Sequence, residues 1–241
     1  RLQRGLLLHR RGRFAEAIDD FTMLLEAKPN AHEVYYRRGL ARHQLRQTED
    51  AIADLDQCLK LKPDFVDAIY VKGNIAASDG KADEAVLLYR EATKIAPTHA
   101  ASWYNEGNLL FNQDKLLEAI ECWTQVIELQ PNLFRAWNNR AAAYAKLGKE
   151  SDALADYERA LSLNPGFAKA WDNLAWLLAT SEDPEIRDAV RAVTIAKKAC
   201  ELTNFHDWSC MSTLAAAYAE AGDMEQASSW AKRSREVAPD E

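Results

Sequence analysis

The chain has 241 residues, and its 37 acidic and 30 basic side chains give a formal net charge of −7. This acidic balance argues against a nucleic-acid binder, which needs a basic stripe to neutralise phosphates. With 48% hydrophobic residues, nine glycines and seven prolines, the chain is too apolar to remain disordered.

No segment has the character of a membrane span. Leu174–Ala179, one of the longest apolar runs, is far shorter than the roughly 18 residues that crossing a bilayer requires. The first residue is Arg1 rather than Met, so we expect the sequence to be part of a longer protein. We expect no membrane span.

The four cysteines are scattered and form no CxxC pair. Each falls inside a helix-like pattern, which is typical of buried free thiols in a reducing compartment. The spacing would suggest only one disulfide, between Cys200 and Cys210. We therefore expect buried thiols and a cytoplasmic location.

Prolines recur at a fixed interval of 34 residues along most of the chain. Small and aromatic residues keep the same interval, and a period of this size indicates stacked supersecondary units. The three rows are Pro29, Pro63, Pro97, Pro131 and Pro165; Ala17, Ala51, Ala85, Ala119 and Ala153; and Phe21, Leu55, Tyr89, Trp123 and Tyr157.

Taken in chain order, each interval predicts two helices. In 134–167, for example, Trp137, Ala141, Tyr144 and Ala145 share one face of a first helix, which Gly148 ends. A second helix follows and stops before Pro165, because proline cannot continue a helix. Seven such repeats are expected, at 1–31, 32–65, 66–99, 100–133, 134–167, 168–207 and 208–241.

This pattern resembles the tetratricopeptide repeat, or TPR, family. The segments Ser102–Asn108 and Ala136–Tyr144 are close matches to the family's first helix, and the pattern recurs five times without a gap. The resemblance implies an all-α fold, in which a single array over residues 1–241 coils into a right-handed α–α superhelix with a concave groove. It also implies a protein or peptide partner.

The sixth repeat departs from the period because it is six residues too long. The extra residues lie in Thr180–Asp188, which we expect to form a loop that can be shortened at little cost in stability. The repeat that follows, with its Ala216–Gln226 segment, resembles the end of many bacterial TPR arrays.

The predicted groove is lined by residues four, seven, eight and eleven positions after each proline, which share one helical face. From these we select twelve candidates for contacts with a bound peptide: Tyr70, Asn74, Tyr104, Asn105, Asn108, Arg135, Asn138, Asn139, Lys169, Asp172, Asn173 and Trp176.

Within this set, Asn105, Asn139 and Asn173 form a row at the same place in three successive repeats. A carboxamide both donates and accepts hydrogen bonds, so it can pair with the backbone of an extended peptide. The row is similar to the asparagine ladder of the O-linked N-acetylglucosamine transferases. The alternative interpretation is that asparagine at these positions follows the consensus sequence of the family and contacts no ligand.

A second resemblance is to the TPR cochaperones that clamp a C-terminal carboxylate. Asn108, Asn139 and Lys169 match three of the five clamp positions, but Tyr104 and Asn173 replace the other two, which are cations. Loss of two cations weakens carboxylate capture, so we do not expect a true clamp here.

No sequence motif for catalysis is present: GxGxxG, GxxxxGK[ST], HExxH and GxSxG are all missing. We therefore expect no enzyme activity, no catalytic residue, no cofactor and no metal. The predicted function is a protein-interaction scaffold that binds an extended peptide or a partner helix. The alternatives are a recruiting domain of a larger enzyme and a module that assembles with itself through its terminal repeats, where Trp230 lacks an obvious cover.

Overall fold

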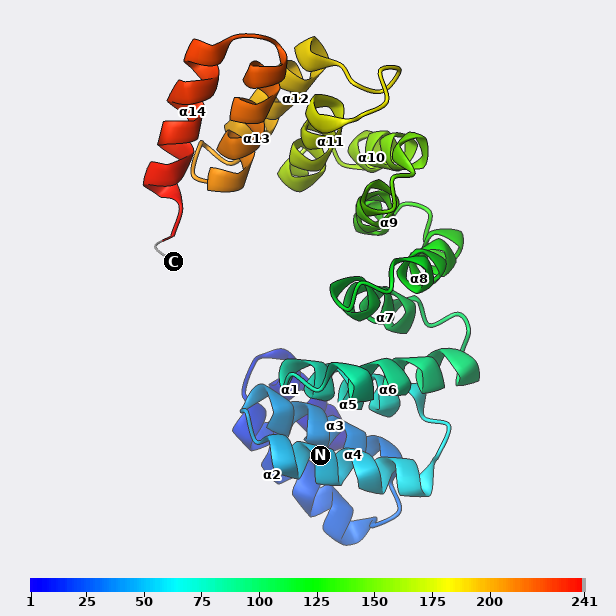
Figure 1. The fold of residues 1–241 in the computed structure, drawn as a ribbon. Helices are drawn as coiled ribbons and strands as arrows, with labels where there is room; N and C mark the ends of the chain where they lie inside the picture. Colours follow the sequence, from blue (N-terminus) through cyan, green and yellow to red (C-terminus); the bar gives the residue numbers. More distant parts are fainter. Residues whose placement is uncertain (240–241) are drawn as a thin grey trace. The chain divides into compact units, whose positions relative to one another are not determined.

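The computed structural model describes residues 1–239, and every regular element within that range is a helix (Figure 1). Fourteen helices follow one another: α1 (Leu2–Arg10), α2 (Phe14–Ala27), α3 (His32–Gln44), α4 (Thr48–Leu61), α5 (Val66–Ser78), α6 (Ala82–Ile95), α7 (Ala100–Asn112), α8 (Leu116–Leu129), α9 (Phe134–Lys146), α10 (Glu150–Leu163), α11 (Ala168–Thr180), α12 (Ala189–Leu202), α13 (Trp208–Glu220) and α14 (Met224–Val237). The predicted all-α helical-repeat fold is confirmed.

The chain divides into two compact units. The N-terminal unit is Arg1–Leu109 and the C-terminal unit is Leu110–Glu241. Within each unit, a first helix packs on the second helix that follows it, as α3 does on α4 and α9 on α10. None of the helices in the described range is long and apolar enough to cross a membrane.

Small residues let the helices of a pair approach closely. A β-carbon at Gly73 would lie 2.6 Å from Cε1 of Tyr89, so any larger residue would push that ring away. Ala85 of the same repeat and Tyr89 itself are almost fully buried. The predicted packing, with small residues at the crossing and aromatic side chains in the gaps, is confirmed for this pair.

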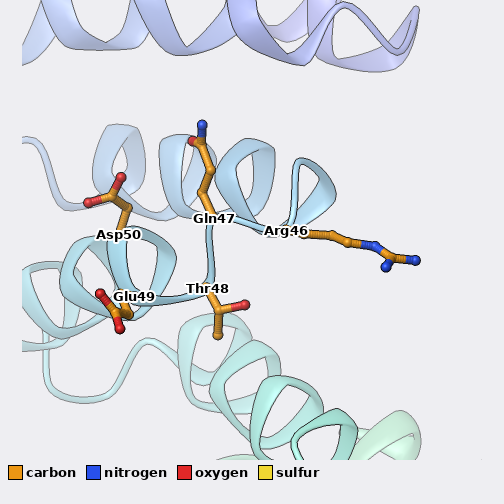
Figure 2. Close-up of a pocket in the computed structure, with 5 residues that line it drawn as sticks. All are labelled: Arg46, Gln47, Thr48, Glu49 and Asp50. Atoms are coloured by element: carbon orange, nitrogen blue, oxygen red, sulfur yellow. The ribbon is translucent and has the colours of Figure 1, made fainter.

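The short turn inside a helix pair contains one residue with a left-handed backbone. Gly12, Gly80 and Gly148 have φ values of 73°, 76° and 72°, which glycine adopts without strain. At the same place in two other repeats, Arg46 and Asp114 have φ values of 59° and 61°. Residues 46–50 enclose a shallow hollow at the first of these turns, where Figure 2 shows the Arg46 side chain directed outward.

Three tryptophans fasten the start of one repeat to the end of the one before. The indole Nε1 of Trp103 donates to the carbonyl oxygen of Pro97 at 2.9 Å. Trp137 donates in the same way to Pro131 at 2.9 Å, and Trp171 to Pro165 at 2.8 Å. The equivalent residues of two earlier repeats are Tyr35 and Ile69.

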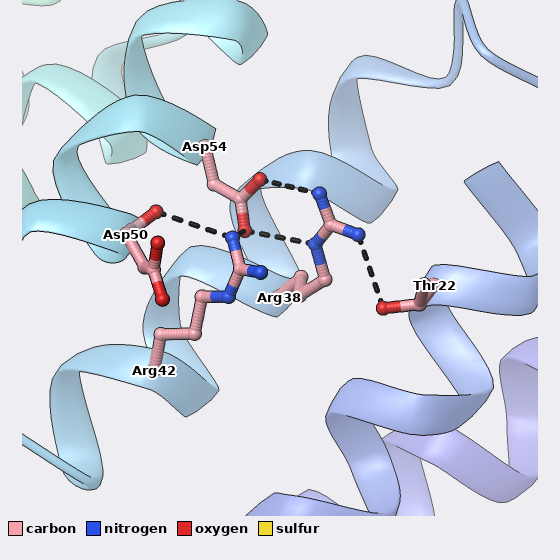
Figure 3. Close-up of polar contacts among 5 residues, drawn as sticks. All are labelled: Thr22, Arg38, Arg42, Asp50 and Asp54. Carbon is pink, nitrogen blue, oxygen red and sulfur yellow. Dashed lines mark hydrogen bonds and ion pairs between the residues drawn. The ribbon is translucent and has the colours of Figure 1, made fainter. Parts of the chain in front are cut away.

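Ion pairs between residues sixteen positions apart cross-link the helices. In the N-terminal unit, Arg38 binds both carboxylate oxygens of Asp54, at 2.9 and 2.7 Å, and donates to Thr22 Oγ1 at 3.0 Å (Figure 3). Arg42 adds a bond to Asp54 at 2.8 Å and one to the carbonyl oxygen of Asp50 at 3.3 Å. The Asp54 side chain is 4% exposed, so this is an interior network.

The long turn of the sixth repeat is packed structure. Residues 181–188 are not helical, as predicted, but Ile186 is 7% exposed and belongs to the core of the C-terminal unit. Ser181 is also buried and donates to Glu150, while Asp188 caps α12 by accepting from the backbone N–H of Arg191 at 2.9 Å. The loop contributes an apolar side chain to the core, which argues against the expectation that it can be shortened at little cost in stability.

Aromatic stacking covers Trp230 within the chain itself. Its ring stacks on Phe205 with centroids 5.6 Å apart, and the Arg233 guanidinium lies 5.1 Å from its centroid. Phe205 has a φ of 56°, a conformation that an aromatic residue adopts only when its surroundings hold it there. Trp230 is therefore covered within its own chain and gives no reason to expect self-assembly.

The four cysteines are buried thiols, as predicted. Burial raises the pKa of Cys58 to about 11 and that of Cys200 and Cys210 to about 12. At neutral pH these three groups are protonated and poor nucleophiles.

Candidate functional site

In the N-terminal unit, three of the predicted groove residues line one pocket, and a fourth, Tyr70, bonds to one of them. The pocket has a volume of about 260 Å³ and is lined by Asn74, Ala77, Tyr89, Asn105, Asn108 and Leu109. Asn105 Nδ2 donates to Asn74 Oδ1 at 3.0 Å and to the Tyr70 hydroxyl oxygen at 3.2 Å. Helices α5 and α7 therefore bring their asparagines into direct contact.

The Tyr89 hydroxyl supports this contact from the second helix α6. It donates to Asn74 Oδ1 at 2.8 Å, and the tyrosine is 1% exposed. Burial raises the pKa of Tyr89 to about 12, so the hydroxyl keeps its proton at neutral pH. Sequence reasoning placed Tyr89 in the aromatic packing row and missed this polar role. The available signal was its hydroxyl, which Phe21 and Leu55 at the same place do not have.

In the C-terminal unit, the asparagines of α9 and α11 also bond to one another. Asn173 Nδ2 donates to Asn138 Oδ1 at 3.1 Å, and Asn138 Nδ2 donates to Asn139 Oδ1 at 3.2 Å. Asn138 is 4% exposed, whereas Asn139 and Asn173 are half-buried. Asn138 thus holds Asn139 and Asn173 by hydrogen bonds, and its own carboxamide is not exposed to solvent.

Asp172 is likewise buried. One of its oxygens, Oδ2, lies 3.1 Å from Lys169 Nζ and accepts from Ser209 Oγ at 3.2 Å. Lys169 and Arg135 remain exposed at the surface, and the Arg135 guanidinium lies 5.5 Å from the ring centroid of Phe134. The exposed charges here are therefore the cations Arg135 and Lys169, while the Asp172 carboxylate is buried.

The remaining groove candidates differ in exposure. Trp176 is 51% exposed, and the residues at the same place in the repeats before and after it are Ala142 and Ala216. Tyr70 and Tyr104 are half-buried. The indole of Trp176 is consequently the large open apolar surface on α11.

One polar cluster contains the three residue types of a hydrolase triad, namely Ser, His and Asp. His99 Nδ1 lies 2.8 Å from Ser102 Oγ, and His99 Nε2 lies 3.9 Å from an oxygen of Asp67. Ser102 is fully buried, however, and the backbone N–H of Ser102 donates to the same histidine nitrogen at 3.3 Å. His99 caps the start of α7, and a buried hydroxyl cannot attack a substrate. Among the described residues, no group of three or more His, Cys, Asp or Glu side chains could hold a metal ion.

Solved structures that resemble this chain are themselves helical-repeat proteins. The C-terminal part of a TPR repeat-containing protein from Cytophaga hutchinsonii matches with a TM-score of 0.77 at 18% identity, covering 100% of this chain and 96% of its own. YrrB, described as a TPR protein with an unusual peptide-binding site, has a TM-score of 0.67 at 22% identity, covering 77% of this chain and 93% of its own. MamA has a TM-score of 0.62 at 24% identity, with coverage of 68% and 96%. At these identities the likeness shows the fold alone.

Models of the repeat itself match three segments. Two models described as tetratricopeptide repeat match residues 36–100 and 134–167, and one described as TPR repeat matches 107–148. Together the segments span just over half of the chain. No curated protein matches the sequence. With its period of 34 residues, its helix pairs and these matches, the chain belongs to the tetratricopeptide repeat family.

Proposed function

We propose that the chain is a protein-interaction scaffold that binds an extended peptide segment along the first helices of its repeats. One observation supports the proposal: the asparagines that the sequence places in a row have their carboxamides held by hydrogen bonds to neighbouring side chains outside the row. Asn105 is held by Asn74 and Tyr70, and Asn173 is held by Asn138.

A fixed carboxamide is a suitable partner for a peptide backbone. Each peptide group carries one donor and one acceptor, and an extended chain presents both along its length. Because Asn105 and Asn173 are already oriented, binding orders fewer side chains and loses less entropy. Each bond to the backbone contributes about 0.5–1.5 kcal/mol and places little demand on the ligand's sequence.

Side chains beside the row can add selectivity. Arg135 and Lys169 are exposed cations that favour acidic residues in the ligand, and this term weakens as salt rises. Trp176 offers an open aromatic face to an apolar or proline side chain. The reported peptide-binding site of YrrB is consistent with such a use of the fold.

The test is selection of ligands from a random peptide library by the immobilised chain, followed by calorimetry on the selected peptides. We expect the triple change Asn105→Ala, Asn139→Ala and Asn173→Ala to weaken binding by about tenfold or more, because up to three hydrogen bonds are lost. The matched control is Asn132→Ala, an exposed asparagine in a turn outside the row. Equal affinity of the triple variant and the parent would refute the asparagine row as the binding surface.

A further inference from the structure

Two asparagines in the pocket of the N-terminal unit are joined by a hydrogen bond, which leaves a donor on one carboxamide and an acceptor on the other. Asn74 Oδ1 accepts two bonds, one from the Tyr89 hydroxyl at 2.8 Å and one from Asn105 Nδ2 at 3.0 Å. Both lone pairs of that oxygen are therefore used. What Asn74 retains for a ligand is the pair of hydrogens on its Nδ2.

Asn105 has the opposite polarity. Its Nδ2 donates to Asn74 and to the Tyr70 hydroxyl oxygen, so both amide hydrogens are committed. Its Oδ1 accepts no bond from these partners and is what Asn105 retains for a ligand. Rotating one carboxamide alone by half a turn would place two donors or two acceptors against each other. Rotating both together keeps the bonds, since the two tyrosine hydroxyls can donate or accept, and it exchanges the free donor with the free acceptor. In either arrangement the two asparagines offer a ligand one donor group and one acceptor.

We infer that this pocket selects a carboxamide side chain, that of Asn or Gln in a bound peptide, over the carboxylate of Asp or Glu. The inference rests on the proposed peptide-binding function and specifies one side chain of the ligand. A primary carboxamide carries an acceptor and a donor side by side, which complement Asn74 Nδ2 and Asn105 Oδ1. Ala77 and Leu109 supply apolar walls for the methylene groups.

A carboxylate does not fit the same pocket. It has acceptors only, so one oxygen would face Asn105 Oδ1 and remain without a hydrogen bond. None of the residues that line the pocket carries a charge to compensate for burying the anion. The penalty for a buried unsatisfied group makes the carboxylate bind at least about tenfold more weakly than the carboxamide.

Tyr89 is the positioning residue in this scheme. It lines the pocket but is 1% exposed, so it acts by holding Asn74 and offers almost no surface to a ligand. Without its hydroxyl, Asn74 Oδ1 loses one of its two hydrogen bonds and is held by Asn105 alone. The change Tyr89→Phe should therefore reduce the preference for the carboxamide to about twofold or less, since one orienting hydrogen bond is lost. The ring, and with it the packing on Gly73, is preserved.

The experiment uses the full chain labelled with ¹⁵N and two probes, N-acetylglutamine N-methylamide and N-acetylglutamate N-methylamide. The side-chain NH₂ signals of Asn74 and Asn105 are followed by NMR as each probe is added. We expect saturable shifts of the Asn74 signal with the glutamine probe, with at least about tenfold weaker binding of the glutamate probe. Tyr89→Phe should remove the difference while circular dichroism and Tm change little.

Asn105→Ala provides a second variant in case Tyr89→Phe fails to fold. Removing the acceptor that faces the carboxylate should narrow the difference between the two probes. Equal or tighter binding of the glutamate probe to the parent chain would overturn the inference. So would shifts that map away from the pocket, or no shift at the highest soluble concentration. Library peptides that depend on the asparagine row but show no Gln-over-Glu preference would overturn this inference alone and leave the proposed function standing.

Discussion

Arg140 and Asp156, sixteen residues apart, form a two-point ion pair, with Arg140 Nε 2.7 Å from one carboxylate oxygen and Nη2 2.9 Å from the other. The side chains are 14% and 7% exposed, and Arg140 Nη1 also donates to Thr124 Oγ1 at 3.0 Å. One arginine thus joins its own helix pair to the preceding one. In the next repeat, Leu174 occupies the place of Arg140.

Breaking this pair should be costly. Asp156→Ala leaves the guanidinium without its counter-charge in a mostly buried site, and we expect a loss of about 3–5 kcal/mol of unfolding free energy in urea titrations. The double variant Arg140→Leu with Asp156→Leu should recover most of that loss, because two apolar side chains need no partner. If the double variant is as unstable as the single one, the pair does not act through charge.

A pH dependence follows from Arg4 and Asp20. The Arg4 guanidinium donates to the buried Asp20 carboxylate, with Nε 2.6 Å from Oδ2, and this bond lowers the pKa of Asp20 below its ordinary value. A carboxyl group with a depressed folded-state pKa stabilises the fold above its unfolded-state pKa. That stability is lost as the pH falls through the folded-state value.

Arg4→Ala should therefore lower Tm at neutral pH and narrow its gap to the parent on acidification, since protonated Asp20 needs no cation. Tm is measured at a series of pH values from neutral to acid for both proteins. Asp20→Asn, which cannot ionise, is the matched control. In this variant Tm should fall less steeply at acidic pH than in the parent. Parallel Tm curves for parent and Arg4→Ala would contradict the assignment.

Arg46 adopts the left-handed backbone that glycine adopts in four other repeats, at Gly12, Gly80, Gly148 and Gly222. A side chain in this conformation costs about 1–2 kcal/mol, part of which glycine's greater unfolded-state entropy offsets. Arg46→Gly is therefore expected to stabilise the N-terminal unit by about 0.5–1 kcal/mol in chemical unfolding. The neighbouring Gln47 has a φ of −86° and is exposed, so Gln47→Gly should give no gain. Equal effects of the two changes would show that strain at Arg46 is negligible.

The packed turn of the sixth repeat makes a fourth prediction. Ile186→Ala should lower the free energy of unfolding by about 2–4 kcal/mol, because it opens a cavity in the core of the C-terminal unit. Val190→Ala, at a residue 77% exposed, should have almost no effect. Deletion of residues 182–187 should be at least as costly as Ile186→Ala, and a fully stable deletion variant would restore the view of a dispensable loop.

The helices could be predicted from the sequence because their boundaries depend on local chemistry. Gly148 ends α9 by its left-handed backbone, and Pro165 follows the end of α10, as the pattern indicated. These residues act within one turn of the chain, so their effect does not depend on tertiary contacts.

The long-range polar contacts could not be predicted in the same way. A row of asparagines indicates a shared face, but the burial of Asn138 and the only partial burial of Asn139 depend on how α9 and α11 sit against each other. The hydrogen bond from Tyr89 to Asn74 needs the close approach that Gly73 permits. Ile186 occupies a core site only because the turn folds back, and the spacing of polar residues in that turn gave no sign of it.

The indole-to-proline bonds have a mechanical consequence. Trp103, Trp137 and Trp171 each tie the first turn of a helix to the end of the previous one, whereas Ile69 has no group that could make such a tie to Pro63. Bending stiffness should therefore differ from joint to joint, with the α4–α5 joint more compliant than the α6–α7 joint. A force that a ligand applies to the N-terminal unit would therefore act on a compliant α4–α5 joint and a stiffer α6–α7 joint.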